Sequence, residues 1–407
     1  LPMNRLCQGD VGSGKTMVAA ACVYFAARNG RQAALMAPTE ILARQHYETL
    51  SPLLEPLGLR CALLTGSTGV KARRETNAAL AAGDIDLAIG THALLTGTVT
   101  FRDLGLVVTD EQHRFGVAQR AALAEKGLHP HTLVMSATPI PRTLALILYG
   151  DLDVSLIDEL PPGRQPIETF AVPGSYRPRI YAFLRKHIAQ GRQAYIVCPM
   201  VESGEEGGED AKAVKDYASQ LQKEVFPDLR VAFVHGKMKP KEKEAVMAAF
   251  AAGETDLLVS TTVIEVGVDV PNAAVMVVEN AERFGLSQLH QLRGRVGRGK
   301  HQSYCILISD NQNEETRQRL KILTKTNDGF RLAEEDLRLR GPGDFFGVRQ
   351  HGLPGLRVAD LGCDAQLLQS AKKSAETLLA GDPELAHSPA LRDRVAELFA
   401  RNAETMN

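Results

Sequence analysis

The octet Gly9-Asp10-Val11-Gly12-Ser13-Gly14-Lys15-Thr16 decides the fold of this 407-residue chain, because it fits the phosphate-loop pattern G-x-x-x-x-G-K-[ST]. The glycines let backbone N–H groups close around a polyphosphate, and Lys15 supplies a cation to the β and γ oxygens. Thr16 offers a hydroxyl to Mg²⁺, and a helix expected over residues 17–28 points its positive end at the anion. A glycine-rich surface turn is the alternative, but a chance match in a chain of this length has a probability of about one per cent. We therefore expect a nucleotide and Mg²⁺ at this loop.

The composition indicates a soluble globular chain of two or three domains. It is 44% apolar and 23% charged with a net charge of −1, so any nucleic-acid contact must come from local patches. The longest apolar run, residues 17–27, is too short to span a bilayer, and no signal-like segment precedes the first strand. The six cysteines form no C-x-x-C pair, which favours buried free thiols in a reducing cytoplasm. The chain enters its first strand almost at once, so we expect a fragment that lacks an N-terminal part.

Short apolar strands alternate with helices in two successive blocks. The first block has expected strands over residues 5–8, 32–37, 60–65, 86–90, 105–110 and 132–136. The second has expected strands over residues 193–198, 230–234, 256–261, 274–279 and 304–309, with helices over 177–190 and 212–226. This alternation predicts two α/β units, each a parallel sheet covered on both faces, with a ligand-binding cleft between them.

Proline and glycine mark the boundaries between these units. The Pro/Gly-rich stretch 159–175 indicates an interdomain linker. Beyond residue 311 we expect only helices, over 314–324, 330–339, 360–379 and 389–401, with a Gly/Pro-rich loop over 340–355. The expected domains are a first α/β domain (1–160), a linker (161–175), a second α/β domain (176–311), a hairpin and loop (312–355) and a C-terminal helical extension (356–407).

An acidic pair follows the apolar strand at residues 105–109. In Asp110-Glu111-Gln112-His113, Asp110 is placed to hold hydrated Mg²⁺, and Glu111 can polarise the attacking water. A solvated acidic turn is the alternative. A carboxylate at the carboxyl end of a parallel strand, in the same sheet as a phosphate loop, favours the metal site.

Two weaker signals have a similar placement. Ser136-Ala137-Thr138-Pro139 follows the next strand with two hydroxyls that suit sensing of the γ-phosphate, although helix caps often look alike. Gly267-Val268-Asp269 follows a strand of the second unit, and Asp269 can reach a ribose from there. A simple turn explains that segment equally well.

Arginines gather in Gln291-Leu292-Arg293-Gly294-Arg295-Val296-Gly297-Arg298. Arg295 and Arg298, three residues apart, are expected on one helix face that points across the cleft at the nucleotide, where arginine stabilises charge on the γ-phosphoryl group. A solvated basic helix or a phosphate-backbone contact is the alternative. Glycine inside a helix is costly, so Gly294 and Gly297 suggest that another part of the molecule approaches closely here.

The ordered set of motifs resembles the superfamily 2 helicases. The segments that carry this resemblance are Gly9–Thr16, Ala37-Pro38-Thr39-Glu40, Thr65-Gly66-Ser67, Gly90-Thr91-His92, Asp110–His113, Ser136–Thr138, Val234-His235-Gly236, Thr261–Asp269 and Gln288–Arg298. More narrowly, the chain resembles the RecG family of branch-migrating DNA helicases. That likeness rests on Asp110–Val117, Ser136–Thr143, Leu289–Gly299 and Arg340-Gly341-Pro342-Gly343-Asp344, in addition to the phosphate loop.

The resemblance implies a role for each matching residue. It implies two RecA-like parallel-sheet domains in tandem, followed by a C-terminal helical hairpin and a helical extension. The implied catalytic set is Lys15, Asp110, Glu111, Gln291, Arg295 and Arg298, and Mg²⁺ would be held by Thr16 and Asp110, partly through water. The implied ATP-binding set is Gly9, Asp10, Val11, Gly12, Ser13, Gly14, Lys15, Thr16, Gly267 and Asp269. Residues implied to bind DNA or to couple it to ATP are Thr39, Gly66, Thr91, Ser136, Thr138, His235, Thr261, Arg338, Arg340, Arg349 and Gln350. Hydroxyls and N–H groups there would grip phosphates without reading sequence.

The implied activity is that of a DNA-dependent ATPase and 3′–5′ DNA helicase. It would move along double-stranded DNA, regress stalled forks and migrate Holliday junctions in recombination and repair of DNA damage. The implied partners are branched DNA and a single-stranded DNA-binding protein, with a monomeric, cytoplasmic and nucleoid-associated enzyme in bacteria. Family members also carry an N-terminal wedge domain with an OB-fold that grips the fork, and no such region precedes Leu1 in this sequence.

Three alternatives stay open. A transcription-repair coupling translocase shares the hairpin, although its acidic pair is typically followed by Glu-His and not by the Gln112-His113 seen here. An RNA helicase of the same superfamily would respond to RNA. A non-catalytic nucleic-acid-binding clamp would have a degraded catalytic set, whereas Lys15, Asp110 and Glu111 are all present.

A plain bracing role is the alternative for the helical pair, whose basic and acidic residues nearly balance.

Overall fold

The computed structural model describes residues 2–111, 122–137, 152–159, 165–199, 209–261, 270–299, 301–345 and 365–404. The chain divides into two compact units, one made of Leu1–Pro139 with Asp151–Leu332 and the other of Ile140–Gly150 with Ala333–Asn407. The larger unit contains two parallel sheets. We call the described residues 2–159 the first lobe and the described residues 165–332 the second lobe.

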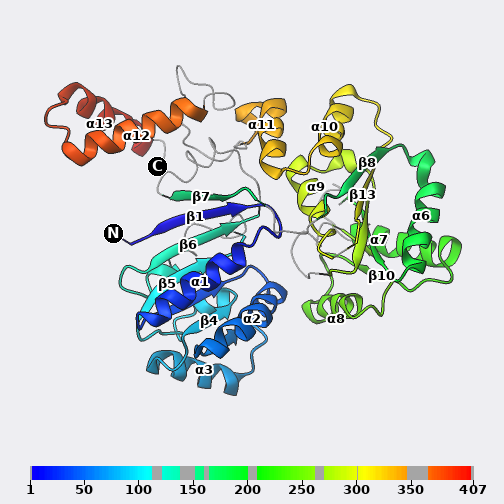
Figure 1. Ribbon diagram of the computed structural model, residues 1–407, viewed down its shortest axis with the longest axis horizontal. Coiled ribbons are helices and arrows are strands. Elements are labelled where there is room, and N and C mark those ends of the chain that lie inside the picture. Colours follow the sequence, from blue (N-terminus) through cyan, green and yellow to red (C-terminus); the bar gives the residue numbers. More distant parts are fainter. Residues whose placement is uncertain are drawn as a thin grey trace. The chain divides into compact units, whose positions relative to one another are not determined.

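The first lobe is built on a seven-stranded parallel sheet with the order β3-β4-β2-β5-β6-β1-β7 (Figure 1). Its strands are β1 (Asn4–Gly9), β2 (Gln32–Met36), β3 (Cys61–Leu64), β4 (Leu87–Gly90), β5 (Leu104–Thr109), β6 (His131–Ser136) and β7 (Asp153–Ile157). The six strands expected from apolar runs are confirmed to within a residue or so at each end. The edge strand β7 was not expected, because its side chains are half-exposed and form no apolar run.

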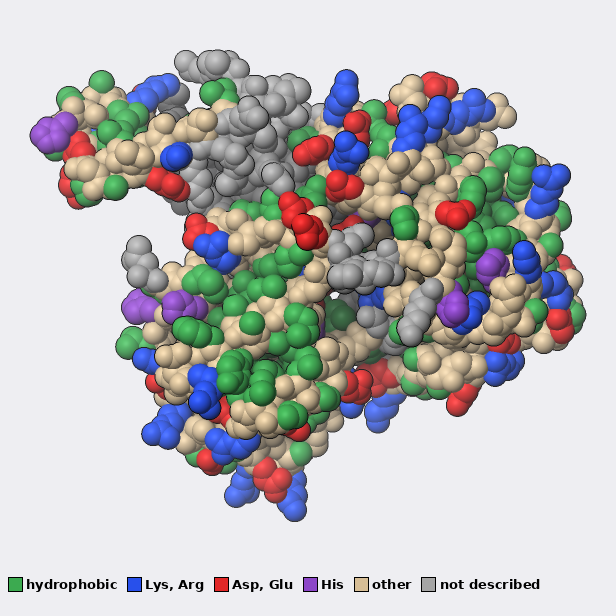
Figure 2. All heavy atoms as spheres, viewed as in Figure 1, with side chains coloured by type: hydrophobic (Ala, Val, Ile, Leu, Met, Phe, Trp, Pro, Cys, Tyr) green, Lys and Arg blue, Asp and Glu red, His purple; other side chains and the backbone are tan. Residues whose placement is uncertain are grey.

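Helices cover this sheet and begin where the sequence signals them. They are α1 (Lys15–Arg28), α2 (Glu40–Leu54) and α3 (Val70–Ala82), with the short 3-10 helices η1 (Glu55–Leu57) and η2 (His92–Leu95). Apolar side chains of α1 and α2 pack with those of β2 and β5 in one core. Helix α1 is also apolar on its outer face: Phe25 is 73% exposed and Met17 54% exposed. Figure 2 shows hydrophobic side chains gathered on the visible face of this lobe.

The second lobe repeats the architecture with a six-stranded parallel sheet of order β10-β11-β9-β12-β13-β8. Its strands are β8 (Glu168–Val172), β9 (Gln193–Val197), β10 (Val231–Val234), β11 (Leu257–Ser260), β12 (Ala273–Val278) and β13 (Tyr304–Ile308). The helices are α6 (Arg177–Ala189), α7 (Glu209–Gln220), α8 (Pro240–Ala251), α9 (Leu286–Arg293) and α10 (Glu314–Lys325), with the short turns η4 (Gly174–Tyr176) and η7 (Ala281–Arg283) and the π-helical turn η5 (Leu221–Val225). Residues 161–175, expected as a linker, include β8, which pairs with β13. The second sheet therefore begins before the expected boundary at residue 176.

The same buried glutamine clamp starts the second strand of the first lobe and the corresponding strand of the second lobe. The Gln32 amide donates to the carbonyls of Leu80 (3.0 Å) and Ile85 (2.8 Å), which flank the turn before β4. The Gln193 amide donates to the carbonyls of Phe250 (2.5 Å) and Thr255 (2.7 Å), which flank the turn before β11. Each glutamine thus adds a side-chain donor to two buried turn carbonyls, of which those of Leu80 and Phe250 also accept the N–H groups of Gly83 (3.2 Å) and Gly253 (3.1 Å).

The smaller unit is helical where it is described. Helix α11 (Gly329–Phe345) begins in the larger unit, and α12 (Ala365–Gly381) and α13 (Pro389–Glu404) follow. We expected α11 to end near residue 339, because proline and glycine disfavour a helix interior. The structure continues the helix through Gly341-Pro342-Gly343, so the expected loop from residue 340 is wrong for residues 340–345. None of the described helices is both long and apolar enough to cross a membrane.

Candidate nucleotide and nucleic-acid site

A cavity of about 390 Å³ lies between the two lobes and collects the strongest motifs of the sequence. From the first lobe it is lined by the phosphate loop, by the start of α1 and by Asp110 and Glu111 after β5. From the second lobe it is lined by Gln291, Arg295 and Arg298. The volume is in the range of small-molecule sites. The lining set is Val11, Gly12, Ser13, Gly14, Lys15, Thr16, Leu42, Gln45, His46, Glu48, Thr49, Asp110, Glu111, Ala137, Gln291, Arg295 and Arg298.

The phosphate loop connects the carboxyl end of β1 to the amino end of α1. Gly12 (φ 74°) and Gly14 (φ 97°) adopt left-handed backbone conformations, which glycine reaches without steric cost. The Lys15 ammonium donates to the carbonyls of Gly9 and Asp10, both at 2.8 Å, so its charge lies within the loop. Burial lowers the pKa of Lys15, while the carboxylates of Asp110 and Glu111 act in the opposite direction. The loop therefore holds one buried cation beside two acids.

Asp110 follows β5, next to the phosphate loop in space. Its Oδ2 lies 2.7 Å from Nε2 of His46 on α2, and its Oδ1 accepts the backbone N–H of Glu111 at 3.0 Å. Burial alone would raise the pKa of Asp110, but the hydrogen bond and charge of His46 and the charge of Lys15 hold it below its ordinary value. The carboxylate is therefore ionised and oriented at both oxygens.

Glu111 is held in an unusual backbone conformation with φ 52°. A non-glycine residue pays about 1–2 kcal/mol in the left-handed region, and such strain is typical of functional sites. Burial and the neighbouring Asp110 raise the pKa of Glu111, whereas the charges of Arg295 and Lys15 act against that rise. The side chain is thus placed and tuned as a proton acceptor would be.

The second lobe presents its arginines from a turn and not from a helix. Helix α9 ends at Arg293, Gly294 is its C-cap, and Gly297 has φ 77°. The expectation that Arg295 and Arg298 share a helix face is therefore wrong, because both residues lie beyond the end of α9, in a segment where Gly297 adopts a left-handed conformation. Both side chains still line the cavity, and the Arg298 Nε donates to the Gly294 carbonyl at 3.1 Å.

Gly294 fulfils the expected close approach. A Cβ atom at this position would lie 2.9 Å from the Cβ of Val11 in the phosphate loop, so a larger residue would push the two lobes apart here. Beside this contact, Nε2 of His290 lies 2.6 Å from Oδ1 of Asp10. The last turn of α9 therefore touches the phosphate loop directly.

Two polar residues that the sequence analysis did not single out extend this contact. Arg293 is buried (2% exposed) and its Nη2 donates to Nδ1 of His290 at 2.9 Å. Its Nη1 donates to the carbonyls of Leu323 (2.9 Å) and Thr326 (2.8 Å) at the end of α10. Because Nδ1 accepts from arginine, Nε2 of His290 carries the hydrogen that it donates to Asp10. His46, the third missed residue, sits on an apolar helix face, where spacing gives no sign of a carboxylate partner.

The residues proposed for DNA follow the carboxyl ends of strands, so each lobe gathers its own at one sheet edge. They are Thr39 after β2, Gly66 after β3, Thr91 after β4, Ser136 at the end of β6, His235 after β10 and Thr261 after β11. The Thr39 hydroxyl caps α2 by accepting the Leu42 N–H at 3.3 Å, and the Thr91 hydroxyl caps η2. Thr91 and Thr261 are only 2% and 3% exposed, so they shape their turns from within.

Some expected site residues cannot be placed. Thr138, Gly267, Asp269, Arg349 and Gln350 lie outside the described residues, as do Gln112 and His113. Arg338 lies on α11 with an exposed side chain, and Arg340 belongs to the same helix without a described side chain. Among the described residues, no cluster of His, Cys, Asp and Glu forms a ready-made metal site.

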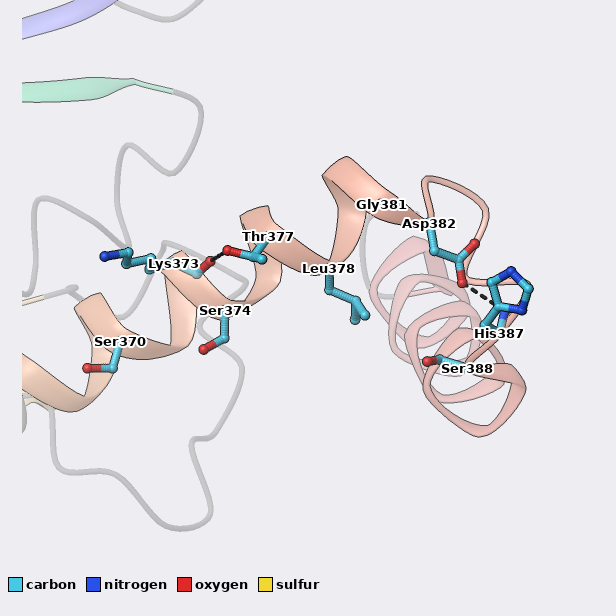
Figure 3. Close-up of a pocket in the computed structure, with 9 residues that line it drawn as sticks. All are labelled: Ser370, Lys373, Ser374, Thr377, Leu378, Gly381, Asp382, His387 and Ser388. Carbon is cyan, nitrogen blue, oxygen red and sulfur yellow. Dashed lines mark hydrogen bonds between the residues drawn. The ribbon is translucent and has the colours of Figure 1, made fainter.

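A second, open groove lies between α12 and α13 in the smaller unit (Figure 3). Its lining side chains are exposed or half-buried. The Asp382 carboxylate accepts the N–H groups of Ala386 and His387 at 2.8 and 2.7 Å, so it closes the turn between the helices. This groove is a product of helix packing and gathers none of the sequence motifs.

The fold and the cavity together define the core of a helicase motor. Residues 2–147 match the model of the DEAD/DEAH box helicase family, and residues 179–300 match the helicase conserved C-terminal domain. Structures of yeast Dbp5 bound to RNA share the fold at a TM-score of 0.58 and 16% identity, covering 84% of each chain. Residues 326–398 narrow the assignment, because they match the model "ATP-dependent DNA helicase RecG, domain 3, C-terminal".

The chain belongs to the family of the ATP-dependent DNA helicase RecG. It is 54% identical over 400 residues to RecG of Synechocystis sp., covering 98% of this chain and 48% of that protein. It is 51% identical over 410 residues to RecG of Bacillus subtilis, covering 100% of this chain and 59% of that protein. A solved structure of RecG bound to a three-way DNA junction matches with a TM-score of 0.75 and 48% identity, covering 90% of this chain and 48% of that one. The chain thus spans about half the length of the curated relatives it matches.

Proposed function

We propose that this chain is the motor of an ATP-dependent DNA translocase that regresses stalled replication forks and migrates Holliday junctions in recombination and repair. The proposal rests on its RecG family membership and on one observation, the split cavity. There the phosphate loop and two carboxylates face Gln291, Arg295 and Arg298 from the other lobe. A site whose two halves belong to two lobes changes shape when the lobes move. We expect hydrolysis to be coupled to movement for that reason.

The chain's own groups fit ATP with Mg²⁺. The Ser13 hydroxyl is buried with no hydrogen-bond partner among the described residues, and a Cβ at Gly9 would lie only 2.4 Å from it, so the loop is shaped for an acceptor of another molecule. Lys15 would bind the β and γ oxygens, and Thr16 with Asp110 would hold Mg²⁺, partly through water. The ion would supply charge neutralisation at the phosphates.

Catalysis then falls to Glu111 and the arginines. Glu111, with its raised pKa, would accept a proton from the attacking water, and Arg295 and Arg298 would stabilise charge on the γ-phosphoryl group. Gln291 would sense that group from the end of α9. Gly267 and Asp269 would contact the nucleoside, and ATP binding would draw these second-lobe groups inward.

DNA would lie along the carboxyl edges of the two sheets. At or just after strand ends on those edges lie Thr39, Gly66, Thr91, Ser136, His235 and Thr261. The turns there offer N–H groups to phosphate, and the buried Thr91 and Thr261 would shape those turns. Thr138 is included in the proposal from its motif alone. Arg338, Arg340, Arg349 and Gln350 would couple lobe closure to duplex movement. We propose polarity 3′–5′, branched DNA as substrate and a single-stranded DNA-binding protein as partner, for a monomeric enzyme of the bacterial cytoplasm and nucleoid.

The domain limits are part of the same proposal: a first RecA-like domain (1–160), a linker (161–175), a second RecA-like domain (176–311), a translocation hairpin (312–355) and a helical extension (356–407). Strand β8 (Glu168–Val172) extends the second domain back into the stretch expected as linker.

The test is ATP hydrolysis by this chain with and without forked DNA, at two salt concentrations. We expect DNA to stimulate turnover, and salt to weaken the stimulation because backbone contacts release counterions. Lys15→Ala and Glu111→Gln should each abolish stimulated turnover while the circular dichroism spectrum stays unchanged. Turnover retained in either variant would contradict the assigned roles. Stimulation by RNA in place of DNA would contradict the substrate.

A further inference from the structure

We propose that His46 is a positioning residue for the ATPase, which holds the Asp110 carboxylate in the orientation that Mg²⁺ requires. The inference rests on the function proposed above and adds to it a role for one hydrogen bond. Nε2 of His46 lies 2.7 Å from Oδ2 of Asp110, and both side chains line the cavity that holds Lys15 and Thr16.

Helix α2 fixes the ring of His46. Ala43, His46, Leu50 and Leu54 recur at helical spacing and form the buried stripe of α2 against the first lobe. The His46 side chain is 9% exposed and that of Asp110 is 14% exposed, so water competes little for the bond between them. A buried ring on this stripe has less freedom to rotate than one on an exposed helix face.

The hydrogen bonds around Asp110 leave room for a metal. Oδ2 accepts from His46 and Oδ1 accepts from the Glu111 N–H at 3.0 Å, so the carboxylate plane is set from both sides. Each carboxylate oxygen has two acceptor sites, and one on each remains for Mg²⁺ or its bound water. Groups that hydrogen-bond a metal-binding carboxylate fix its orientation, and their loss typically costs about 10–100-fold in metal affinity or activity.

A purely structural role is the competing explanation, since a histidine on an apolar stripe can simply satisfy a buried carboxylate. The two explanations differ in what a mutation changes. Loss of a structural bond lowers stability, whereas loss of a positioning bond changes the magnesium concentration that the enzyme needs. Replacing His46 by glutamine or by asparagine, whose amide groups extend to different lengths, distinguishes these two explanations.

The experiment measures ATP turnover against Mg²⁺ concentration at saturating ATP and duplex DNA. His46→Gln places an amide nitrogen within reach of Oδ2, and His46→Asn places the same group one methylene too short. We expect His46→Asn to raise the Mg²⁺ concentration for half-maximal turnover by about 10-fold and to lower kcat by about 10–100-fold. His46→Gln should recover most of both. Binding of a fluorescent ATP analogue without Mg²⁺ should stay within about 2-fold in each variant.

His187→Asn is the matched control. His187 lies on α6 in the second lobe and packs against Phe183 and Tyr304, away from the lining of the cavity. It should leave the Mg²⁺ profile unchanged. If His46→Asn and His46→Gln both keep the wild-type Mg²⁺ profile, or lose turnover equally with no change in that profile, the positioning role is wrong. If the unmodified chain itself shows no DNA-stimulated turnover, the proposed function fails, a result distinct from either of these.

Discussion

Nε2 of His290 in the second lobe lies 2.6 Å from Oδ1 of Asp10 in the phosphate loop. The hydrogen bond joins positions 280 residues apart and continues through Arg293 to the end of α10. The phosphate loop is thereby connected to the helices that follow the second sheet.

Breaking this link should impair turnover without unfolding either lobe. His290→Phe replaces the imidazole by a somewhat larger apolar ring and removes both of its hydrogen bonds. Because a hydrogen bond to a charged group contributes about 1.5–3 kcal/mol, we expect DNA-stimulated kcat to fall about 10–100-fold. Steady-state ATP hydrolysis measures this, with His187→Phe as the control. Unchanged kcat in His290→Phe would mean that the contact is incidental to catalysis.

Glu40 should support the turn that contains Gly66, which we propose to contact DNA. Its Oε2 accepts from the Ser67 hydroxyl at 2.6 Å and its Oε1 accepts the Ser67 N–H at 3.1 Å. Glu40→Ala removes a negative charge, which by itself would favour DNA. We nevertheless expect the DNA concentration for half-maximal ATPase stimulation to rise about 10-fold, because the turn loses its brace.

Whether DNA binding weakens or tightens in Glu40→Ala distinguishes loss of the brace from loss of the charge. Glu75→Ala removes the same charge from an exposed position on α3 and should leave DNA binding equal or slightly tighter. Tighter binding in both variants would show that Glu40 acts through charge alone.

The glutamine clamps should contribute equally to the two lobes. Gln32→Leu and Gln193→Leu each remove the side-chain donor from two turn carbonyls, while Leu80 and Phe250 keep the backbone N–H groups of Gly83 and Gly253. We expect each variant to lower the free energy of unfolding by about 1–3 kcal/mol. The chain contains no tryptophan, so a single introduced tryptophan reports on one lobe during urea unfolding. Phe25→Trp follows the first lobe and Phe170→Trp follows the second, because both positions are exposed. A loss below about 1 kcal/mol in either variant would rule out the clamp as a major contribution.

The thiols of Cys305, which is buried, and of Cys198, which is half-buried, should resist alkylation in the native protein. Burial raises the pKa of Cys305 to about 12, and burial with the charge of Glu279 raises that of Cys198 to about 12. At pH 8 their thiolate fraction is therefore about a thousandth of that of an ordinary thiol, and iodoacetamide should react correspondingly slowly. Peptide mapping by mass spectrometry checks this at each cysteine. Rates that match those of the urea-unfolded chain would contradict the burial.

Local signals predicted the sheets well because their central strands are apolar runs. The edge strands β7 and β8 were missed because their burial patterns alternate weakly, and only pairing with β1 and β13 defines them. The turn after α9 was mistaken for helix, since the left-handed conformation of Gly297 cannot be read from its neighbours.

The residues of the candidate site also fall into two groups, those that the sequence predicts and those that it does not. Lys15, Asp110 and the arginines belong to contiguous motifs, so their convergence in one cavity could be expected from order alone. His46 and His290 could not be found, because each meets its carboxylate across 64 or 280 residues of chain. The two glutamine clamps were also missed, although the sequence repeats around them. Gly30-Arg31-Gln32-Ala33 in the first lobe recurs as Gly191-Arg192-Gln193-Ala194 in the second.

The repeated glutamine clamp has a consequence for how the chain folds while it is being synthesised. Two lobes that begin a central strand with the same residues and tie it to the same kind of turn could exchange strands, a misassembly typical of repeated architectures. The first sheet is complete at Ile157, whereas the strand that begins at Gln193 is made later. As domains generally fold in order during synthesis, we expect the first clamp to close before its counterpart emerges. The order of the lobes along the chain would then keep the strands of the two sheets apart.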